Sequence, residues 1–170
     1  MKDNPQFKTM RHIEAVRNYL SKCIEELLKR GREHDQSKLQ EPELSIFNEY
    51  TQKLRGITYG SDEYKQCMQE MKPALEHHYL HNSHHPEYHK TKDQYVLNGS
   101  SVLGCMTLFE IIEMLCDCKA ATLRHGDGDI YKSLEINAKR FGYSDEVKAI
   151  FKNTIDWIEK QDVEHHADES

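Results

Sequence analysis

The sequence predicts an all-α fold, a single helical domain of about five to seven helices. Apolar residues recur every three to four positions over long segments, as on one face of an α-helix. The four prolines and eight glycines of the 170 residues are thinly spread, which leaves room for long helices. No segment alternates apolar and polar residues in the way of a half-buried strand. One domain also suits a chain of this length.

The first two helices are predicted by apolar spacing and by their boundaries. A helix is expected over residues 8–30, with Gly31 placed to end it. A second is expected over residues 42–54, because Pro42 is compatible with the first turn of a helix. The stripe of the first helix consists of Ile13, Val16, Leu20, Ile24, Leu27 and Leu28.

A third helix is expected to begin after Ser61, whose hydroxyl can cap it. We expect this helix to continue, despite Pro73, toward Leu80. Residues 82–93 are predicted to form a loop, because Pro86 disfavours a helical conformation of the residue before it.

Three further helices complete the predicted domain. The first is expected over residues 101–126, and the others over residues 130–141 and 145–160. The predicted domain covers residues 1–160, and residues 161–170 form a polar tail that we expect to be flexible.

The composition argues against several classes of protein. The formal charge of −6 argues against binding to duplex nucleic acid. No apolar run approaches the roughly 18 residues that span a bilayer, and the start has no apolar signal-peptide core. The five cysteines have no framework spacing and are interpreted as free thiols in a reducing compartment. We therefore expect a cytoplasmic protein that does not enter membranes.

The segment REHDQSKLQ places a histidine beside an aspartate, His34 and Asp35. Imidazole and carboxylate together suit divalent metals such as zinc, manganese or iron. Lys38 follows His34 by about one helical turn, where its ammonium group could hold a phosphate beside an ion. Alone, the dipeptide is equally compatible with a capping aspartate among solvated neighbours.

Six histidines lie within residues 76–89. If the third helix reaches this far, His78, His81 and His85 share one face. Asn82 is a candidate for orienting a ligand or a water molecule. A solvated histidine-rich loop with no function is the alternative interpretation.

The helix predicted over residues 101–126 carries a stripe of carboxylates, Glu110, Glu113 and Asp117, at spacings of three and four. Such a stripe ordinarily faces water. The remainder of this helix is nearly all apolar or small, which is typical of a central helix. Buried carboxylates require partners, and a metal ion or an arginine is the usual one.

The order of these motifs resembles that of the HD-domain superfamily of metal-dependent phosphohydrolases. HDQSK is similar to the His-Asp-x-x-Lys signature, and MLCDCKAA to the late helix that supplies the final aspartate. HNSHHPE stands where two-metal members carry further histidines. Over residues 9–154 the chain also resembles a small uncharacterised family of bacteria and phages, with the motifs HDQSKL and HNSHHPEY.

The resemblance implies an HD-like helical bundle with one or two divalent ions (manganese, iron, zinc, magnesium, cobalt or nickel). The implied ligands of a first ion are His12, His34, Asp35 and Asp117. A second ion, or the substrate, would be contacted by His78, His84 and His85. Glu113 would orient a ligand or act as a base, and Lys38 would bind phosphate.

Two departures from the superfamily pattern matter. No Gly-Tyr-Pro follows the histidine pair, so specificity for cyclic dinucleotides is not implied. His12 and His34 are 22 residues apart, which in an unbroken helix means a separation of about 33 Å. For both to bind one ion, the first helix must bend near residues 18–21.

The leading functional hypothesis is hydrolysis of a small phosphate ester, a nucleotide or a cyclic nucleotide. The residues expected to contact this substrate are Lys38, Asn82, Arg124 and Arg140. One alternative is a non-catalytic metal-binding protein that interacts with host factors in the host cytoplasm, and another is a di-iron oxygenase. Spare apolar surface would also allow a homodimer.

Overall fold

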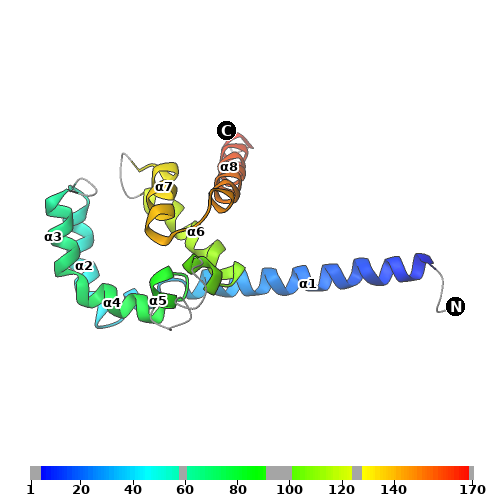
Figure 1. Ribbon diagram of the computed structural model, residues 1–170, viewed down its shortest axis with the longest axis horizontal. Coiled ribbons are helices and arrows are strands. Elements are labelled where there is room, and N and C mark those ends of the chain that lie inside the picture. The colour runs from blue at the N-terminus through cyan, green and yellow to red at the C-terminus, as the bar shows by residue number, and fades with distance from the viewer. Residues whose placement is uncertain (1–4, 58–60, 91–100, 124–127, 169–170) are drawn as a thin grey trace. The chain divides into compact units, whose positions relative to one another are not determined.

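A computed structural model describes residues 5–57, 61–90, 101–123 and 128–168, and within these ranges the chain is helical and has no strand (Figure 1). The prediction of an all-α fold is confirmed. The elements are α1 (Pro5–Glu33), η1 (Gln36–Leu39), α2 (Glu43–Leu54), α3 (Asp62–Glu70), α4 (Lys72–His81), α5 (Pro86–Lys90), η3 (Val102–Cys105), α6 (Leu108–Thr122), α7 (Ile130–Phe141) and α8 (Asp145–Asp168).

The chain divides into two compact units, Met1–His34 and Asp35–Ser170. Within the first unit the described structure is the single helix α1, which has no buried side chain. Gly31 does not end this helix, which continues to Glu33, because a lone glycine costs only about 1 kcal/mol relative to alanine.

The core of the second unit is formed by η3, α6, α7 and α8. Ile155 of α8 is fully buried in this core. A capping box begins α6: the Thr107 hydroxyl accepts from the Glu110 backbone N–H, and the Glu110 carboxylate accepts from the Thr107 backbone N–H. The cap fixes where α6 starts and therefore which of its faces meets the core. The buried residues of this core are Val102, Leu103, Met114, Leu115, Ile130, Leu134, Ala138, Phe141, Tyr143, Phe151 and Ile155.

A second group of packed helices consists of α2, α3 and α4. Ser61 caps α3 as predicted, since its hydroxyl accepts from the backbone N–H of Tyr64. The single helix predicted from Ser61 toward Leu80 is wrong, because α3 ends at Glu70 and α4 begins at Lys72. Pro73 explains the interruption: proline fits the first turn of a new helix and breaks the interior of an existing one.

The loop predicted over residues 82–93 is wrong in part. Pro86 begins the short helix α5, again as a proline in a first turn. This helix contacts both α4 and η3, so it connects the two groups of helices. α8 also differs from the prediction, because it runs to Asp168 rather than ending near residue 160.

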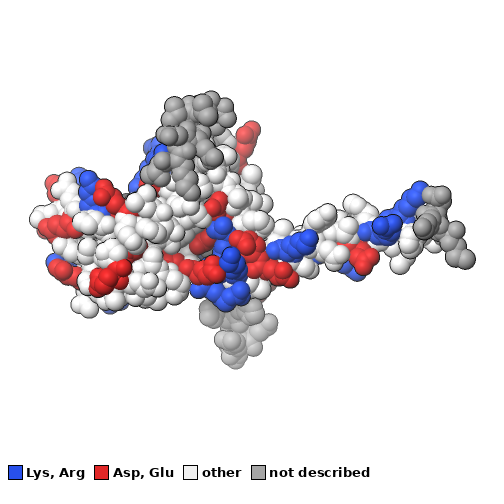
Figure 2. Space-filling view, turned by 90° about the horizontal axis from the view of Figure 1, so that it is seen from below, with Lys and Arg blue, Asp and Glu red and all other residues white. Residues whose placement is uncertain are grey.

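No helix in the described ranges combines the length and the apolar character that crossing a membrane requires. Figure 2 shows acidic and basic side chains interspersed on the face in view, without a broad basic area. This mixture agrees with the acidic net charge.

Candidate metal centre

The centre begins at Asp35, which has a left-handed backbone conformation with φ 56° and ψ 16°. Aspartate tolerates this region better than most residues, although it still costs about 1–2 kcal/mol. The turn leads directly into η1 and leaves the side chain of Asp35 only 15% exposed. A strained residue with a buried carboxylate is a frequent property of functional sites.

Two histidine nitrogens face one oxygen of this carboxylate. Nε2 of His78, at the end of α4, lies 3.2 Å from Asp35 Oδ1. Nε2 of His84, in the turn between α4 and α5, lies 3.5 Å from the same oxygen. Nε2 of His85 completes the group, 2.9 Å from Nε2 of His78. The sequence prediction that Asp35 and the histidine-rich segment lie together is therefore confirmed.

The spacing of these four residues fits a metal ion. Their ligand atoms all lie within 4.8 Å of one another. Two donors about 2.1 Å from an ion are roughly 3.0 Å apart at a right angle and roughly 3.4 Å apart at a tetrahedral angle. The distances of 2.9, 3.2 and 3.5 Å lie within or close to this range. The cluster of Asp35, His78, His84 and His85 could therefore hold an ion; we call it the metal cluster.

Carboxylates lie next to Nδ1 of two of the histidines. Nδ1 of His78 lies 2.8 Å from Oε2 of Glu43, and Nδ1 of His84 lies 3.1 Å from Oε1 of Glu113. An ionised carboxylate only accepts hydrogen bonds, so each ring donates from Nδ1. Each Nε2 then keeps a lone pair that points into the cluster, as in carboxylate–histidine–metal arrangements.

His85 is also in the form that binds metals. Burial, together with the neighbouring imidazoles of His84 and His78, lowers the pKa of His85 to about 3, against the opposing effect of Asp117 and Asp35. The imidazole is therefore neutral near pH 7. A neutral imidazole is the form that coordinates a metal ion.

Asp117 extends the cluster from α6. It offers a ligand atom within 4.8 Å of one on His84. Glu113, one helical turn earlier, lies 3.1 Å from Nδ1 of the same ring. The predicted carboxylate stripe of this helix thus brings two members to His84. The third, Glu110, is held by the capping box and lies 3.9 Å from His89.

Two predicted metal ligands, His12 and His34, belong to the first unit. His34 is the last residue of that unit and is joined to Asp35 by a peptide bond. His12 lies on the uninterrupted helix α1, about 33 Å from His34 along the axis. The bend that both would need is absent from α1, so the prediction that His12 and His34 bind the same ion is wrong.

The predicted substrate contacts are engaged with protein groups. Nζ of Lys38 lies 2.5 Å from Oδ2 of Asp35, on the oxygen that faces away from His78. The amide nitrogen of Asn82 donates to the Ser37 hydroxyl and to the His78 carbonyl.

Arg140 also has a protein partner, since its guanidinium group lies 2.6 Å from Oε1 of Glu87. The other arginine predicted to bind substrate, Arg124, lies outside the described residues.

Two residues of the centre, Glu43 and Ser37, were missed by the sequence predictions. Glu43 is 0% exposed, and its Oε1 lies 2.7 Å from Nδ1 of His77. The Ser37 hydroxyl donates to Oε2 of Glu43. A glutamate in the first turn of a helix is common and stabilising, so nothing local separates Glu43 from an ordinary helix-terminal carboxylate.

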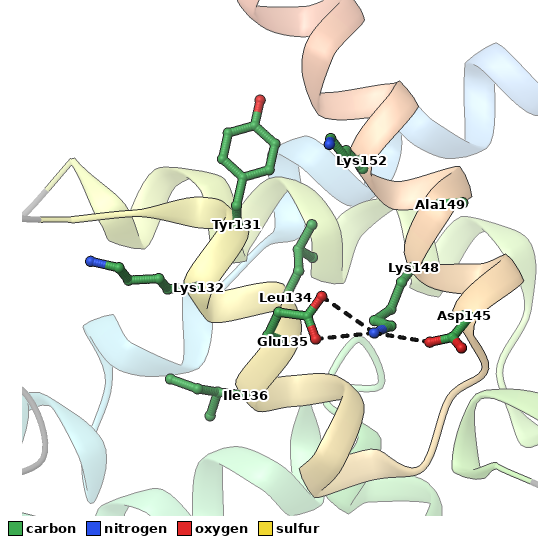
Figure 3. Close-up of a pocket in the computed structure, with 9 residues that line it drawn as sticks. All are labelled: Tyr131, Lys132, Leu134, Glu135, Ile136, Asp145, Lys148, Ala149 and Lys152. Carbon is green, nitrogen blue, oxygen red and sulfur yellow. Dashed lines mark hydrogen bonds and ion pairs between the residues drawn. The ribbon is translucent and has the colours of Figure 1, made fainter.

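A groove of about 710 Å³ between α7 and α8 has no relation to this centre (Figure 3). No residue of the metal cluster lines it. Its central lysine, Lys148, forms ion pairs with Glu135 and Asp145, as Figure 3 shows. We assign no function to this groove.

A protein-family model described as a family of unknown function, DUF5662, matches residues 1–162. No curated protein gives a significant match to the chain. No solved structure gives one either.

Proposed function

Since the chain belongs to this family of unknown function, we propose from its own residues that it is a metal-dependent phosphohydrolase acting on a small phosphate ester. The substrate class is a nucleotide or a cyclic nucleotide. One observation carries the proposal: Asp35, His78, His84 and His85 present their ligand atoms within 4.8 Å of one another. The resemblance of the motif order to the HD-domain superfamily supports the same reaction.

The chemistry of the donors favours a particular group of metals. Three imidazole nitrogens and one carboxylate suit manganese, iron, cobalt, nickel or zinc. Magnesium prefers oxygen ligands and retains its waters, so it fits this set poorly. When bound, such an ion lowers the pKa of a coordinated water and polarises phosphoryl oxygens.

The side chains around the metal cluster suit the remaining tasks. Lys38 brings a positive charge to Asp35, where it can also meet a phosphate oxygen. Glu113 holds His84 by its Nδ1, which favours the orienting role over that of a base. We assign proton transfer to no residue.

The test combines metal analysis with turnover. The purified full chain would be analysed for bound metals and assayed, with each candidate ion, on a panel of nucleotides, cyclic nucleotides and model phosphate esters. Asp35→Asn should abolish metal-dependent hydrolysis while keeping the left-handed turn. His81→Ala is the matched control, since His81 belongs to the same segment but is exposed and outside the metal cluster. Metal-loaded protein that releases no phosphate or phosphodiester product would refute the hydrolase.

Burial of the ligands favours a second candidate, a metal ion that only stabilises the fold. His78 is 1% exposed and His84 is similarly enclosed, which is typical of closed structural sites. A tightly bound ion without turnover would support this non-catalytic protein. Iron together with oxygen consumption would instead support the oxygenase.

A further inference from the structure

We propose that Glu43 is the positioning residue of the metal cluster: it fixes the proton of His78 on Nδ1 and so directs the lone pair of Nε2 at the ion. This inference rests on the proposed metal centre, but not on the reaction assigned to it. Glu43 itself faces away from the site and contacts no ligand atom of the cluster other than through the His78 ring.

The surroundings of Glu43 leave its carboxylate only one arrangement of hydrogen bonds. Its side chain is fully buried, so the charge must be satisfied by protein donors. Oε1 accepts from Nδ1 of His77 at 2.7 Å, and Oε2 accepts from Nδ1 of His78 at 2.8 Å. Ser37 donates to Oε2 at 3.0 Å. One carboxylate therefore determines the tautomers of two adjacent histidines.

Neighbouring groups remove the alternative tautomer of His78. The two amide hydrogens of Asn82 are used by the Ser37 hydroxyl and the His78 carbonyl. The Ser37 hydroxyl hydrogen is used by Glu43. Nδ1 of His78 also lies 3.0 Å from the amide nitrogen of Asn82 and 3.2 Å from the Ser37 hydroxyl. With their hydrogens used in this way, neither group has one left to donate to it. The ring therefore keeps its proton there, and Nε2 faces Asp35 and His85 with its lone pair.

Glu43→Gln tests this role with almost no change of shape. A glutamine offers one accepting oxygen and one donating amino group, so the two rings can no longer both donate to it. When His78 has to accept, its proton moves to Nε2, where it blocks coordination. We expect metal affinity to fall about 10- to 100-fold, the usual effect of losing such a partner.

The measurement is a titration of the chelator-treated full chain with Co²⁺, followed by its visible absorption, and a competition titration with Zn²⁺. Glu110→Gln is the matched control, because Glu110 is also buried and near a histidine outside the metal cluster. Glutamine at that position preserves the capping box, so the affinity should match wild type. Glu43→Asp keeps the charge and should recover part of the lost affinity.

The double variant Glu43→Gln/His77→Ala separates positioning from a purely structural role. Without His77, the glutamine oxygen can turn to His78 and accept from Nδ1 again. The metal affinity should then rise above that of Glu43→Gln alone. Two purely structural defects would instead lower the affinity further. Wild-type affinity in Glu43→Gln, or equal loss in Glu110→Gln, would overturn the proposal. Metal binding that depends on Glu43 without any hydrolysis would refute only the proposed reaction.

Discussion

The Nε2 atoms of His78 and His85 lie 2.9 Å apart, on residues from the end of α4 and the turn that follows it. Two neutral imidazoles can approach in this way through one shared proton or through one shared ion. Glu43 places the His78 proton on the opposite nitrogen, so this pair has a proton to share only if His85 supplies it. An ion at this position satisfies both lone pairs at once.

Metal binding should therefore stabilise the folded chain. An ion present at about 100 times its dissociation constant should raise the free energy of unfolding by about 2.7 kcal/mol, because it binds only the folded cluster. Urea unfolding with and without a chelator measures this difference. His85→Ala should remove it, and a chelator effect that persists in that variant would place the ion elsewhere.

The metal-free protein should lose stability as the pH falls below about 6.5. Burial lowers the pKa of His85 to about 3, so between these values the unfolded chain binds a proton that the folded chain does not. For one site the slope is up to about 1.4 kcal/mol per pH unit, with stability rising toward higher pH. Unfolding of chelator-treated protein from pH 4 to 7 measures it. His85→Gln should flatten the slope, and an unchanged slope would contradict the assignment to His85.

Removing Lys38 should affect catalysis more than metal binding. Lys38→Met takes away a cation whose hydrogen bond to a phosphate oxygen is worth about 1.5–3 kcal/mol. We expect kcat/KM to fall roughly 10- to 100-fold on any substrate found, while the Co²⁺ affinity changes much less. Measuring kcat/KM and the Co²⁺ affinity on the same preparation distinguishes the two effects. If the Co²⁺ affinity falls as much as kcat/KM, Lys38 acts on metal binding through its ion pair with Asp35 and does not bind the substrate.

His34 and His12 provide a matched pair, one directly after α1 and the other within it. We expect His34→Ala to weaken metal binding at least about tenfold, because His34 adjoins Asp35 in the HDQSK motif, which resembles the His-Asp-x-x-Lys signature. His12→Ala should have no effect, since α1 carries that residue about 33 Å away along its axis. Co²⁺ titration of both variants is the measurement. Equal Co²⁺ affinities of the two variants would contradict a role for His34 as a ligand.

The fold could be predicted well where the pattern is local. The helices over residues 42–54, 130–141 and 145–160 agree closely with α2, α7 and the first two thirds of α8. Two errors lie at prolines, where the same residue can end a helix or begin one. Pro73 and Pro86 both lie in the first turn of a helix, where the N–H that proline lacks would have no partner within the helix. A third lies in the helix predicted over residues 101–126, because residues 102–105 form η3 and α6 begins only at Leu108, after the Thr107 cap.

The residues of the metal cluster could be predicted, but their surroundings only in part. Asp35 and His84 belong to motifs that are recognisable along the chain, and the three-four spacing on α6 indicated Asp117. Glu43 is 35 residues away from its partner His78, and its role depends on how α2 packs against α4. Sequence periodicity describes one helix at a time, so it contains no information about that pairing.

The left-handed turn at Asp35 places two separate demands on one position of the chain. The backbone there accepts glycine without strain, and asparagine or aspartate at a lower cost than other residues, and only aspartate supplies a charged oxygen. We therefore expect related chains to carry Gly or Asn at this position where the turn is kept but no metal is bound. Asp should occur where both the turn and metal binding are kept.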